Sequence, residues 1–288
     1  MRRVAVAGGI SAPALGQGGW YIGDSPQKAD AERDALRRGI ELGMNLIDTA
    51  EMYGDGRSES LIGGAVAGIR RDSFILVSKV YPHNAGRKNI FASCDASLRR
   101  LRADCIDIYL LHWRGSVPLA ETAACMEELA KAGKIRAWGV SNFDVADMEE
   151  LWSVPGGQNC AVNQVLYHLG SRGIEYDLLP WLRAHGVAAM AYCPLAQGGS
   201  LRRMGKDFGA SEALRRISKK YGASTMQILL AFALKQDGLI AIPKSGSRAH
   251  VEENALAPRL ALSISKEDWD AVDAEFWPPT SKMHLDIE

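Results

Sequence analysis

Short apolar runs without polar alternation recur along the chain, and most of them stop at a polar residue. Runs rich in Val, Ile, Leu and Ala are typical of strands that are buried on both faces of a parallel sheet. A first run lies near residues 13–18. The others end at Asp48, Lys79, His112, Ser141–Asn142, Gln164, Tyr192 and Lys244–Ser245. The pattern therefore predicts eight parallel strands.

Helical patterns fill the intervals between these runs. In residues 25–43, Ser25 is a plausible N-cap, Pro26 takes the first helical position and Gly43 stops the helix. Further helices are predicted over 58–69, 89–102, 118–134, 211–221 and 224–236.

The spacing of the strand ends indicates how the strands are connected. Ends at 48, 79, 112, 141 and 164 are separated by 31, 33, 29 and 23 residues, close to the roughly 30 residues of one βα unit. Eight such units close a barrel. We therefore predict an α/β fold, a (β/α)8 TIM barrel, as a single domain over residues 1–288.

The main alternative is a doubly wound nucleotide-binding fold. That fold needs GxGxxG between its first strand and helix, whereas the glycines of residues 16–20 lead into YIGDSP rather than straight into a helix. The first residues resemble a signal peptide, but GGISAP interrupts the apolar stretch, so we favour a short N-terminal hairpin. Residues 277–288 are expected to form a short covering tail. The long loop of residues 194–209 is expected to be functional.

Composition narrows the range of functions that the chain can have. Thirty-four basic and thirty-four acidic side chains cancel, so no overall field recruits nucleic acid or an anionic membrane. No apolar segment reaches the roughly 18 to 20 residues that span a bilayer. Five cysteines form no CxxC pair and do not cluster with histidines at metal-ligand spacing. We expect free thiols, no metal, and a soluble, monomeric, cytoplasmic protein acting on small molecules.

Four strand-end and loop residues indicate acid–base chemistry: Asp48, Tyr53, Lys79 and His112. A phenol has an ordinary pKa near 10. An ammonium beside it is expected to lower that pKa, while an aspartate keeps the amine charged and oriented. Tyr53 can then protonate an oxygen that gains negative charge, and a neutral His112 can hold the same oxygen. None of the four is an obvious nucleophile, so a hydride from a nicotinamide is expected to attack.

The remaining residues at the predicted barrel mouth suit such a cofactor. Ser141, Asn142 and Gln164 can fix a carboxamide, and Tyr192 offers a ring for stacking. Near the last strand, cations and a hydroxyl at the start of a helix make a phosphate site. The residues of that site are Lys244, Ser245 and Arg248.

With these residues in place, the sequence resembles the aldo-keto reductase family over nearly its whole length. The motifs occur in family order: GMNLIDTAEMYGDGRSESLIG, FILVSKV, IDIYLLHW, WGVSNF, NQVLYH, AYCPLA and IPKSGSRAHVEEN. The resemblance implies a tetrad of Asp48, Tyr53, Lys79 and His112, with Tyr53 as proton donor and NADPH as the usual cofactor. It further implies that Glu253 and Asn254 reach the adenine. We also expect Trp20, Asp48, Leu195 and Gly198 to contact the cofactor.

The resemblance also bears on the substrate. Steroid double-bond reductases of the family carry glutamate where this chain has His112, so the carbonyl-reducing arrangement is intact. Trp20, Tyr81 and Trp113 are expected to form an aromatic wall, although rim packing is an equal alternative for Tyr81. The short tail suggests a pocket open on one side. The pattern looks most like bacterial members that reduce methylglyoxal and other small aldehydes.

Two positions depart from the family pattern. Six residues after Lys244 the family often has an arginine for the 2′-phosphate, where this chain has His250. Arg248 is the candidate to replace it, so NADPH is expected and use of NADH is possible. The family stretch Gly-Thr-Trp reads Gly18-Gly19-Trp20, which leaves backbone contacts there.

Two other functions fit parts of the sequence. One is a cofactor-binding sensor or regulatory module of the same fold, as in the potassium-channel β subunits of the family, although no partner surface is evident. The other is a barrel isomerase or lyase that uses Lys79 as a Schiff base.

Overall fold

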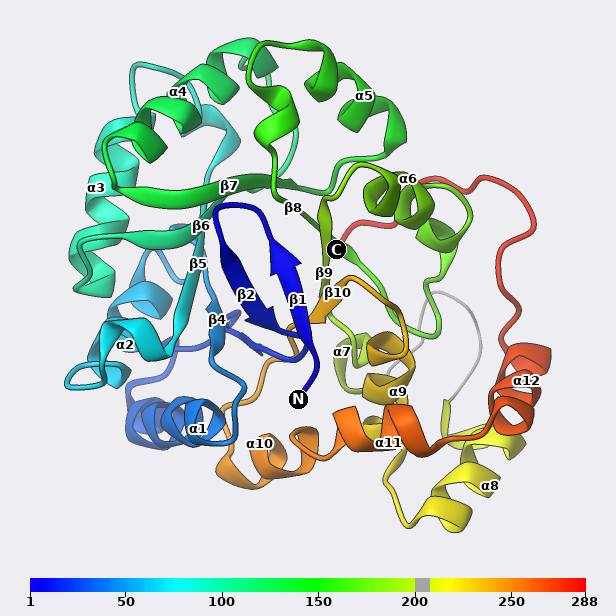
Figure 1. The fold of residues 1–288 in the computed structure, drawn as a ribbon. Coiled ribbons are helices and arrows are strands. Elements are labelled where there is room, and N and C mark those ends of the chain that lie inside the picture. The colour runs from blue at the N-terminus through cyan, green and yellow to red at the C-terminus, as the bar shows by residue number, and fades with distance from the viewer. Residues whose placement is uncertain (200–207) are drawn as a thin grey trace.

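The computed structural model describes residues 1–199 and 208–288. In this part of the chain a parallel sheet of eight strands follows chain order from β3 to β10, and helices surround it (Figure 1). Its strands are β3 (Gln17–Gly18), β4 (Leu46–Asp48), β5 (Ile75–Val80), β6 (Ile106–Leu111), β7 (Ile135–Ser141), β8 (Val162–Leu166), β9 (Ala188–Tyr192) and β10 (Leu239–Ala241).

Backbone hydrogen bonds join the first and last strands and close the sheet. The N–H of Gly16 donates to the carbonyl of Ala241 over 2.8 Å, and the N–H of Ala241 donates to Ala14 over 2.8 Å. Every residue of β5 and β6 is buried, as expected for strands covered on both faces. The prediction of a TIM barrel is confirmed.

Six helices lie where the periodicity predicts them: α1 (Ala29–Glu41), α2 (Arg57–Ala65), α3 (Ile90–Leu101), α4 (Leu119–Lys131), α8 (Glu212–Tyr221) and α9 (Thr225–Leu234). A seventh, α10 (Arg248–Asn254), begins at the predicted phosphate site. The structure also contains α5 (Val145–Ser153), α6 (Leu178–Ala184), α7 (Ala196–Gly199), α11 (Ala257–Ser263) and α12 (Lys266–Glu275), for which no bounds were predicted. Part of the predicted long loop, residues 200–207, lies outside the described residues.

Three details at the ends of elements differ from the prediction. Ser25 makes no capping bond, because Pro26–Lys28 forms a separate 3-10 turn and α1 begins at Ala29. Pro13 belongs to the hairpin rather than to the first barrel strand. The last strand ends at Ala241, and Lys244 is joined to Gly18 only through an isolated bridge.

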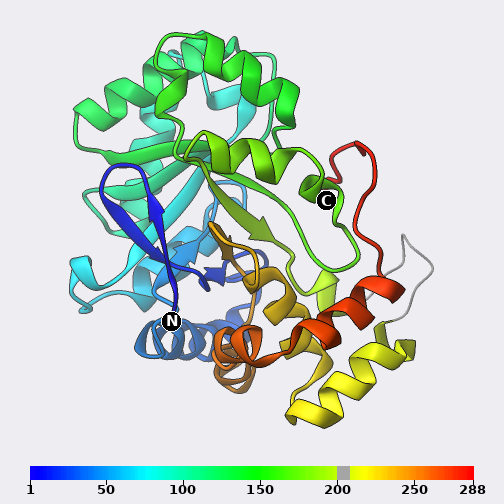
Figure 2. The ribbon, with the colours of Figure 1, turned by 45° about the vertical axis from the view of Figure 1, so that its right-hand side comes forward.

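The hairpin and the tail occupy different places on the barrel. Strands β1 (Arg3–Val6) and β2 (Ile10–Pro13) pair antiparallel, and Gly8 and Gly9 take the positive φ values, 73° and 69°, that the turn between them requires. Figures 1 and 2 show this hairpin across one end of the barrel. The tail after α12 runs back past α6 toward the barrel (Figure 2).

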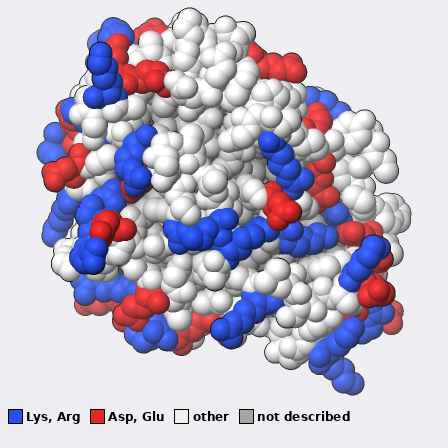
Figure 3. All heavy atoms as spheres, in the orientation of Figure 1, with Lys and Arg blue, Asp and Glu red and all other residues white. Residues whose placement is uncertain are grey.

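The hairpin face carries charges of both signs, with a row of Lys and Arg across its middle (Figure 3). No helix among the described residues is long and apolar enough to cross a membrane.

Candidate functional site

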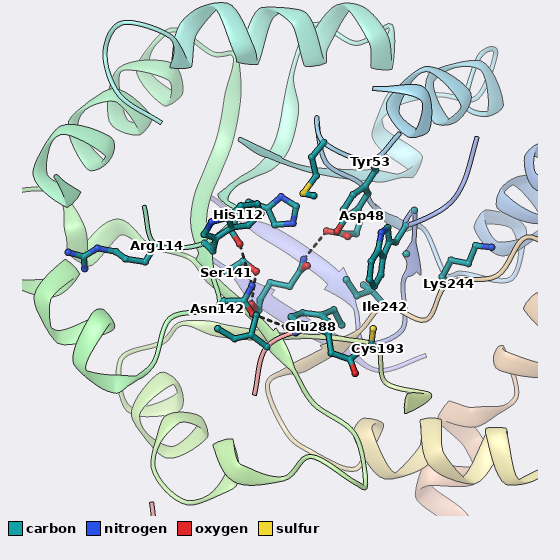
Figure 4. A pocket seen from close by; sticks show the side chains of 18 of the residues that line it. Asp48, Tyr53, His112, Arg114, Ser141, Asn142, Cys193, Ile242, Lys244 and Glu288 are labelled. Atoms are coloured by element: carbon teal, nitrogen blue, oxygen red, sulfur yellow. Dashed lines mark hydrogen bonds between the residues drawn. The ribbon is translucent and has the colours of Figure 1, made fainter. Parts of the chain in front are cut away.

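The polar residues at the strand ends surround one cavity of about 530 Å³. Because the strands are parallel, their carboxyl ends meet at the same end of the barrel, where loops from distant parts of the sequence come together. Figure 4 shows several of the side chains pointing into this space. The lining consists of Gly18, Gly19, Trp20, Asp48, Met52, Tyr53, His112, Trp113, Arg114, Ser141, Asn142, Asp147, Gln164, Tyr192, Cys193, Ile242, Lys244, Ile287 and Glu288.

A buried ammonium joins the acid to the phenol. Lys79 Nζ donates to Asp48 Oδ2 over 2.8 Å, to the carbonyl of Thr49 over 2.8 Å and to Tyr53 Oη over 3.2 Å. The Lys79 side chain is 0% exposed and that of Asp48 is 3% exposed. The strands explain the placement, since Asp48 ends β4 and Lys79 lies near the end of its neighbour β5. The ammonium thus has three oxygen acceptors that fix its position.

Burial dominates the protonation of this cluster. It raises the pKa of Asp48, against the opposing effects of Lys79 and Gln164. It lowers the pKa of Lys79, against the opposing charge of Asp48. The pair is tightly coupled, and the short ion pair favours the doubly charged form. Lys79 therefore acts as a buried ammonium whose charge depends on Asp48.

The pKa of Tyr53 differs from the expectation. We expected Lys79 to lower the pKa of Tyr53, but burial raises it well above the usual value of 10, and the charges of Asp48 and Cys193 raise it further. The expectation was wrong because it counted the neighbouring cation and neglected desolvation. Tyr53 consequently keeps its proton at neutral pH. It can release that proton only to a base as strong as a developing alkoxide.

His112 lies beside the phenol as a neutral ring. The two ring centroids are 5.6 Å apart at an interplanar angle of 72°. Burial, and secondarily the charge of Lys79, lowers the pKa of His112 to about 2. A neutral imidazole carries one N–H, which it can donate to an oxygen in the cavity. This agrees with the neutral histidine that the sequence led us to expect.

The residues predicted to hold a carboxamide converge on one side of the cavity. Ser141 Oγ donates to the carbonyl of Gln164 over 2.8 Å, and Gln164 Nε2 donates to Asp48 Oδ1 over 2.8 Å. Tyr192 Oη donates to Asn142 Oδ1 over 2.9 Å. Asn142 has a positive φ of 60°, a conformation that asparagine tolerates better than most residues. These hydroxyl and amide groups have the donors and acceptors that a carboxamide requires.

The predicted phosphate site is only partly assembled. Lys244 lines the cavity and is exposed. Ser245 lies outside the lining, where its hydroxyl accepts a hydrogen bond from Ser247 N over 3.2 Å. Arg248 is also outside the lining, and it pairs with Asp34 over 3.1 Å. The other predicted cofactor residues outside the lining are Leu195, Gly198, Glu253 and Asn254.

The aromatic wall includes two of the three predicted residues. Trp20 and Trp113 line the cavity, and the Trp20 ring centroid is 6.5 Å from that of Tyr53. Tyr81 is not part of the lining. Its ring packs edge-on against Trp113 with centroids 5.7 Å apart, so it supports the wall from behind.

Sequence reasoning missed several residues of the lining. Met52 and Cys193 are direct neighbours of predicted residues, as is Arg114, so extending each motif by one position would have found them. The tail gave no such signal. Ile287 and Glu288 line the cavity, and the N–H of Glu288 contacts Tyr192 Oη over 3.3 Å. We expected the short tail to leave one side open, whereas its end forms part of the wall.

Comparison with known proteins agrees with this architecture. Residues 14–275 match the aldo/keto reductase family. Methylglyoxal reductase YeaE of Escherichia coli is 49% identical over 286 residues, which is 99% of each chain. Glyoxal reductase of Bacillus subtilis is 32% identical over 94% of this chain and 91% of its own.

Solved structures give the same result. The crystal structure of an aldo-keto reductase from Klebsiella pneumoniae in complex with NADPH has a TM-score of 0.95 and 47% sequence identity, covering 100% of this chain and 99% of its own. A second Klebsiella pneumoniae structure, in complex with NADP and acetate, has a TM-score of 0.94. The chain is an oxidoreductase that belongs to the aldo/keto reductase family.

Proposed function

We propose that the protein reduces small aldehydes and ketoaldehydes, methylglyoxal among them, to alcohols with NADPH, and that Tyr53 donates the proton. Two relatives named for this chemistry, the methylglyoxal and glyoxal reductases, align with more than nine-tenths of the chain. The observation that carries the proposal is the contact of a buried ammonium, Lys79, with Tyr53 at the wall of the cavity.

The residues of the cavity fit a nicotinamide cofactor. When bound, NADPH supplies the hydride that reduces the carbonyl carbon. Ser141, Asn142 and Gln164 would hold its carboxamide, because their amide and hydroxyl groups converge on one side of the cavity. Tyr192 would support the ring. Lys244 would bind a phosphate, because it is a cation of the lining for which the described part of the chain shows no carboxylate partner. The NADP(H) complexes of the Klebsiella relatives support this assignment.

The chain's own residues complete the reduction by moving one proton. His112, neutral at physiological pH, donates its N–H to the carbonyl oxygen and orients it. As that oxygen gains negative charge, it becomes a stronger base than the phenolate, and the Tyr53 proton moves to it. Lys79 lies 3.2 Å from the phenolic oxygen and stabilises the phenolate that remains. Asp48 keeps Lys79 charged for this role. A positioned proton donor of this kind contributes about 10² to 10⁴ in rate.

The direct test is to assay the purified protein with a panel of aldehydes, ketones and sugars, with NADPH and NADH in parallel. The proposal predicts that methylglyoxal and other small aldehydes are reduced with NADPH at a higher kcat/KM than sugars. Absence of aldehyde reduction with either cofactor would contradict it.

We also propose that residues 1–288 act as one domain and as a monomer on small molecules, without nucleic acid. The balanced charge of the chain supports the last point. Light scattering coupled to gel filtration would test the monomer, since a mass of about twice 31.3 kDa would contradict it.

A further inference from the structure

The loop that carries Tyr53 has an unusual backbone. Gly54, Asp55 and Gly56 have positive φ values of 58°, 52° and 85°, and the helix α2 begins directly afterwards at Arg57. A positive φ is uncommon for a residue other than glycine, and it persists only where the surroundings enforce it. The position of the Tyr53 side chain therefore depends on contacts that hold this loop from outside.

Ser58, in the first turn of α2, makes three such contacts and is fully buried. Its N–H donates to the carbonyl of Tyr53 over 3.2 Å. Its hydroxyl donates to the carbonyl of Gly19 over 2.8 Å and accepts a hydrogen bond from Thr49 Oγ1 over 2.8 Å. The hydroxyl is thus used both as a donor and as an acceptor, and it ties the loop to two other segments of the chain.

Both partners of the Ser58 hydroxyl adjoin the site. The carbonyl of Thr49 accepts one of the hydrogen bonds that fix Lys79 Nζ, over 2.8 Å. Gly19 lines the cavity, whereas Ser58 and Thr49 are not among the described residues of the lining. Ser58 therefore connects the backbone of Tyr53 to the residue that holds Lys79 and to the cavity wall, and it does so from behind that wall.

Gly19 has no side chain, and this makes room for the contact. A Cβ at Gly19 would lie 2.7 Å from the carbonyl oxygen of Asp48 and 2.9 Å from Ser58 Oγ. Both distances are shorter than an ordinary van der Waals contact, so a larger residue would push Ser58 away from this backbone. Gly19, at which the sequence showed only a missing hydroxyl, thus allows a different hydroxyl, that of Ser58, to bind its carbonyl.

Glu59 fixes the helical turn to which Ser58 belongs. Its carboxylate is fully buried and accepts hydrogen bonds from Ser78 Oγ and Arg100 Nε, each over 2.6 Å. Ser78 directly precedes Lys79 on β5. The turn that holds the Tyr53 loop is therefore tied to the strand that carries Lys79.

We propose that Ser58 is a positioning residue for proton transfer, whose hydroxyl keeps Tyr53 Oη within hydrogen-bonding distance, 3.2 Å, of Lys79 Nζ. The inference rests on the proposed function and adds to it a residue outside the cavity. In Ser58→Ala the N–H still binds Tyr53, but the links to Thr49 and Gly19 are lost, so the loop can shift relative to Lys79. A shift of about 1 Å at a reacting group can cost about 10²-fold in rate.

The test measures the single-turnover rate of methylglyoxal reduction and the affinity for NADPH in Ser58→Ala and Thr49→Val. The second variant keeps a branched side chain and removes one of the two links. Ser211→Ala is the matched control, because Ser211 is also a buried serine at the start of a helix. Its hydroxyl donates to Glu275 over 2.5 Å and accepts from Leu214 N over 3.1 Å, outside the described cavity lining.

The loss is expected in the chemical step and not in cofactor binding. At a temperature where all variants are folded, Ser58→Ala should lower the single-turnover rate by about 10- to 100-fold with NADPH affinity within about twofold of the wild type. Thr49→Val should lower the rate by less, and Ser211→Ala by less than about twofold.

A double-mutant cycle separates positioning from a merely structural role. In the Tyr53→Phe background Ser58→Ala should change the single-turnover rate by less than about twofold, because the hydroxyl that it positions is gone. A merely structural role would lower the rate by the same factor in both backgrounds. If Ser58→Ala does not fold, Thr49→Val takes its place in the cycle.

Two results would overturn the inference: a Ser58→Ala rate within about twofold of the wild type, or equal losses in the two backgrounds. If the wild type reduces no aldehyde, or Tyr53→Phe keeps the wild-type rate, the proposed function fails instead. A crystal structure of Ser58→Ala then decides the positioning role. The separation of Tyr53 Oη and Lys79 Nζ should exceed about 3.5 Å, and an unchanged separation would overturn the inference.

Discussion

Replacing Asp48 with Asn should destabilise the protein by leaving a buried ammonium without its counter-charge. In the structure Asp48 accepts two hydrogen bonds, one from Lys79 on Oδ2 and one from Gln164 on Oδ1. A carboxylate can accept both, but an amide has one acceptor oxygen and one donor group. In the variant, either Lys79 or Gln164 must face an N–H₂ group.

The magnitude follows from the burial of the pair. Both side chains are almost fully inaccessible, at 0% for Lys79 and 3% for Asp48. Removing one partner of a buried pair costs roughly 3 to 5 kcal/mol. At about 2 to 4 °C per kcal/mol for a chain of roughly this size, the midpoint of thermal unfolding should fall by on the order of 10 °C.

The pH dependence has a definite sign. Burial already lowers the pKa of Lys79, and Asp48 opposes that shift. Without Asp48 the pKa of the folded-state amine falls further, while in the unfolded chain it stays near 10.4. Between these two pKa values the unfolded chain binds more protons than the folded one, so stability rises with pH. Asp48→Asn should therefore recover part of its loss as the pH is raised from 7 to 9, by more than the wild type gains.

The assay is thermal unfolding followed by circular dichroism at several pH values. Asp270→Asn is the control, since Asp270 pairs with Lys266 on an exposed face where the two side chains are 57% and 81% accessible; it should cost less than about 1 kcal/mol. A loss in Asp48→Asn no larger than in the control, or a pH slope equal to that of the wild type, would show that Asp48 does not compensate the charge of Lys79.

Four other perturbations have defined outcomes. Because burial lowers the pKa of His112 to about 2, protonation of His112 should not reduce kcat/KM for an uncharged aldehyde between pH 8 and 5. A fall in kcat/KM toward pH 5 that disappears in His112→Gln would contradict this. Lys244→Ala should weaken NADPH binding by about 10-fold or more in a fluorescence titration, and Arg248→Ala should weaken NADPH more than NADH; an NADPH preference of the wild type above about 100-fold would rule out dual use. In Gly39→Ala the new Cβ would lie 2.1 Å from Gln17 Oε1, so the variant should lose about 1 to 3 kcal/mol in urea unfolding, and an unchanged midpoint would show that the barrel absorbs the methyl group.

The barrel could be predicted from the sequence because its signals are local and repeated. Runs such as IDIYLL are apolar apart from Asp107 and are buried on both faces, and the spacing of about 30 residues between strand ends specifies βα units. The ends of elements were less predictable. Ser25 and Pro26 fit a helix start, yet Pro26–Lys28 forms a separate 3-10 turn and Ser25 makes no side-chain capping bond.

The cavity was predictable to the extent that strand ends supply it. Asp48, Ser141 and Gln164 end or nearly end strands, and parallel strands bring their carboxyl ends together whatever the details of packing. Electrostatics was not predictable in the same way. The sign of the pKa shift of Tyr53 depends on how deeply the ring is buried, which the sequence does not contain.

The contribution of the tail to the cavity could not be predicted from the sequence either. Glu288 is brought to the cavity by long-range contacts, among them that of Ser171 with Asp286, 115 residues apart. No periodicity or spacing encodes such a contact, and the composition of this tail is equally typical of a surface segment.

Single-turnover reduction of methylglyoxal by Tyr53→Phe measures whether Tyr53 donates the proton. Phe keeps the ring and removes only the hydroxyl that Lys79 contacts over 3.2 Å. We expect the variant to bind NADPH within about twofold of the wild-type affinity by fluorescence titration, and to oxidise NADPH more slowly by about 10²-fold or more. A Tyr53→Phe rate within about fivefold of the wild type, at normal NADPH affinity, would contradict it.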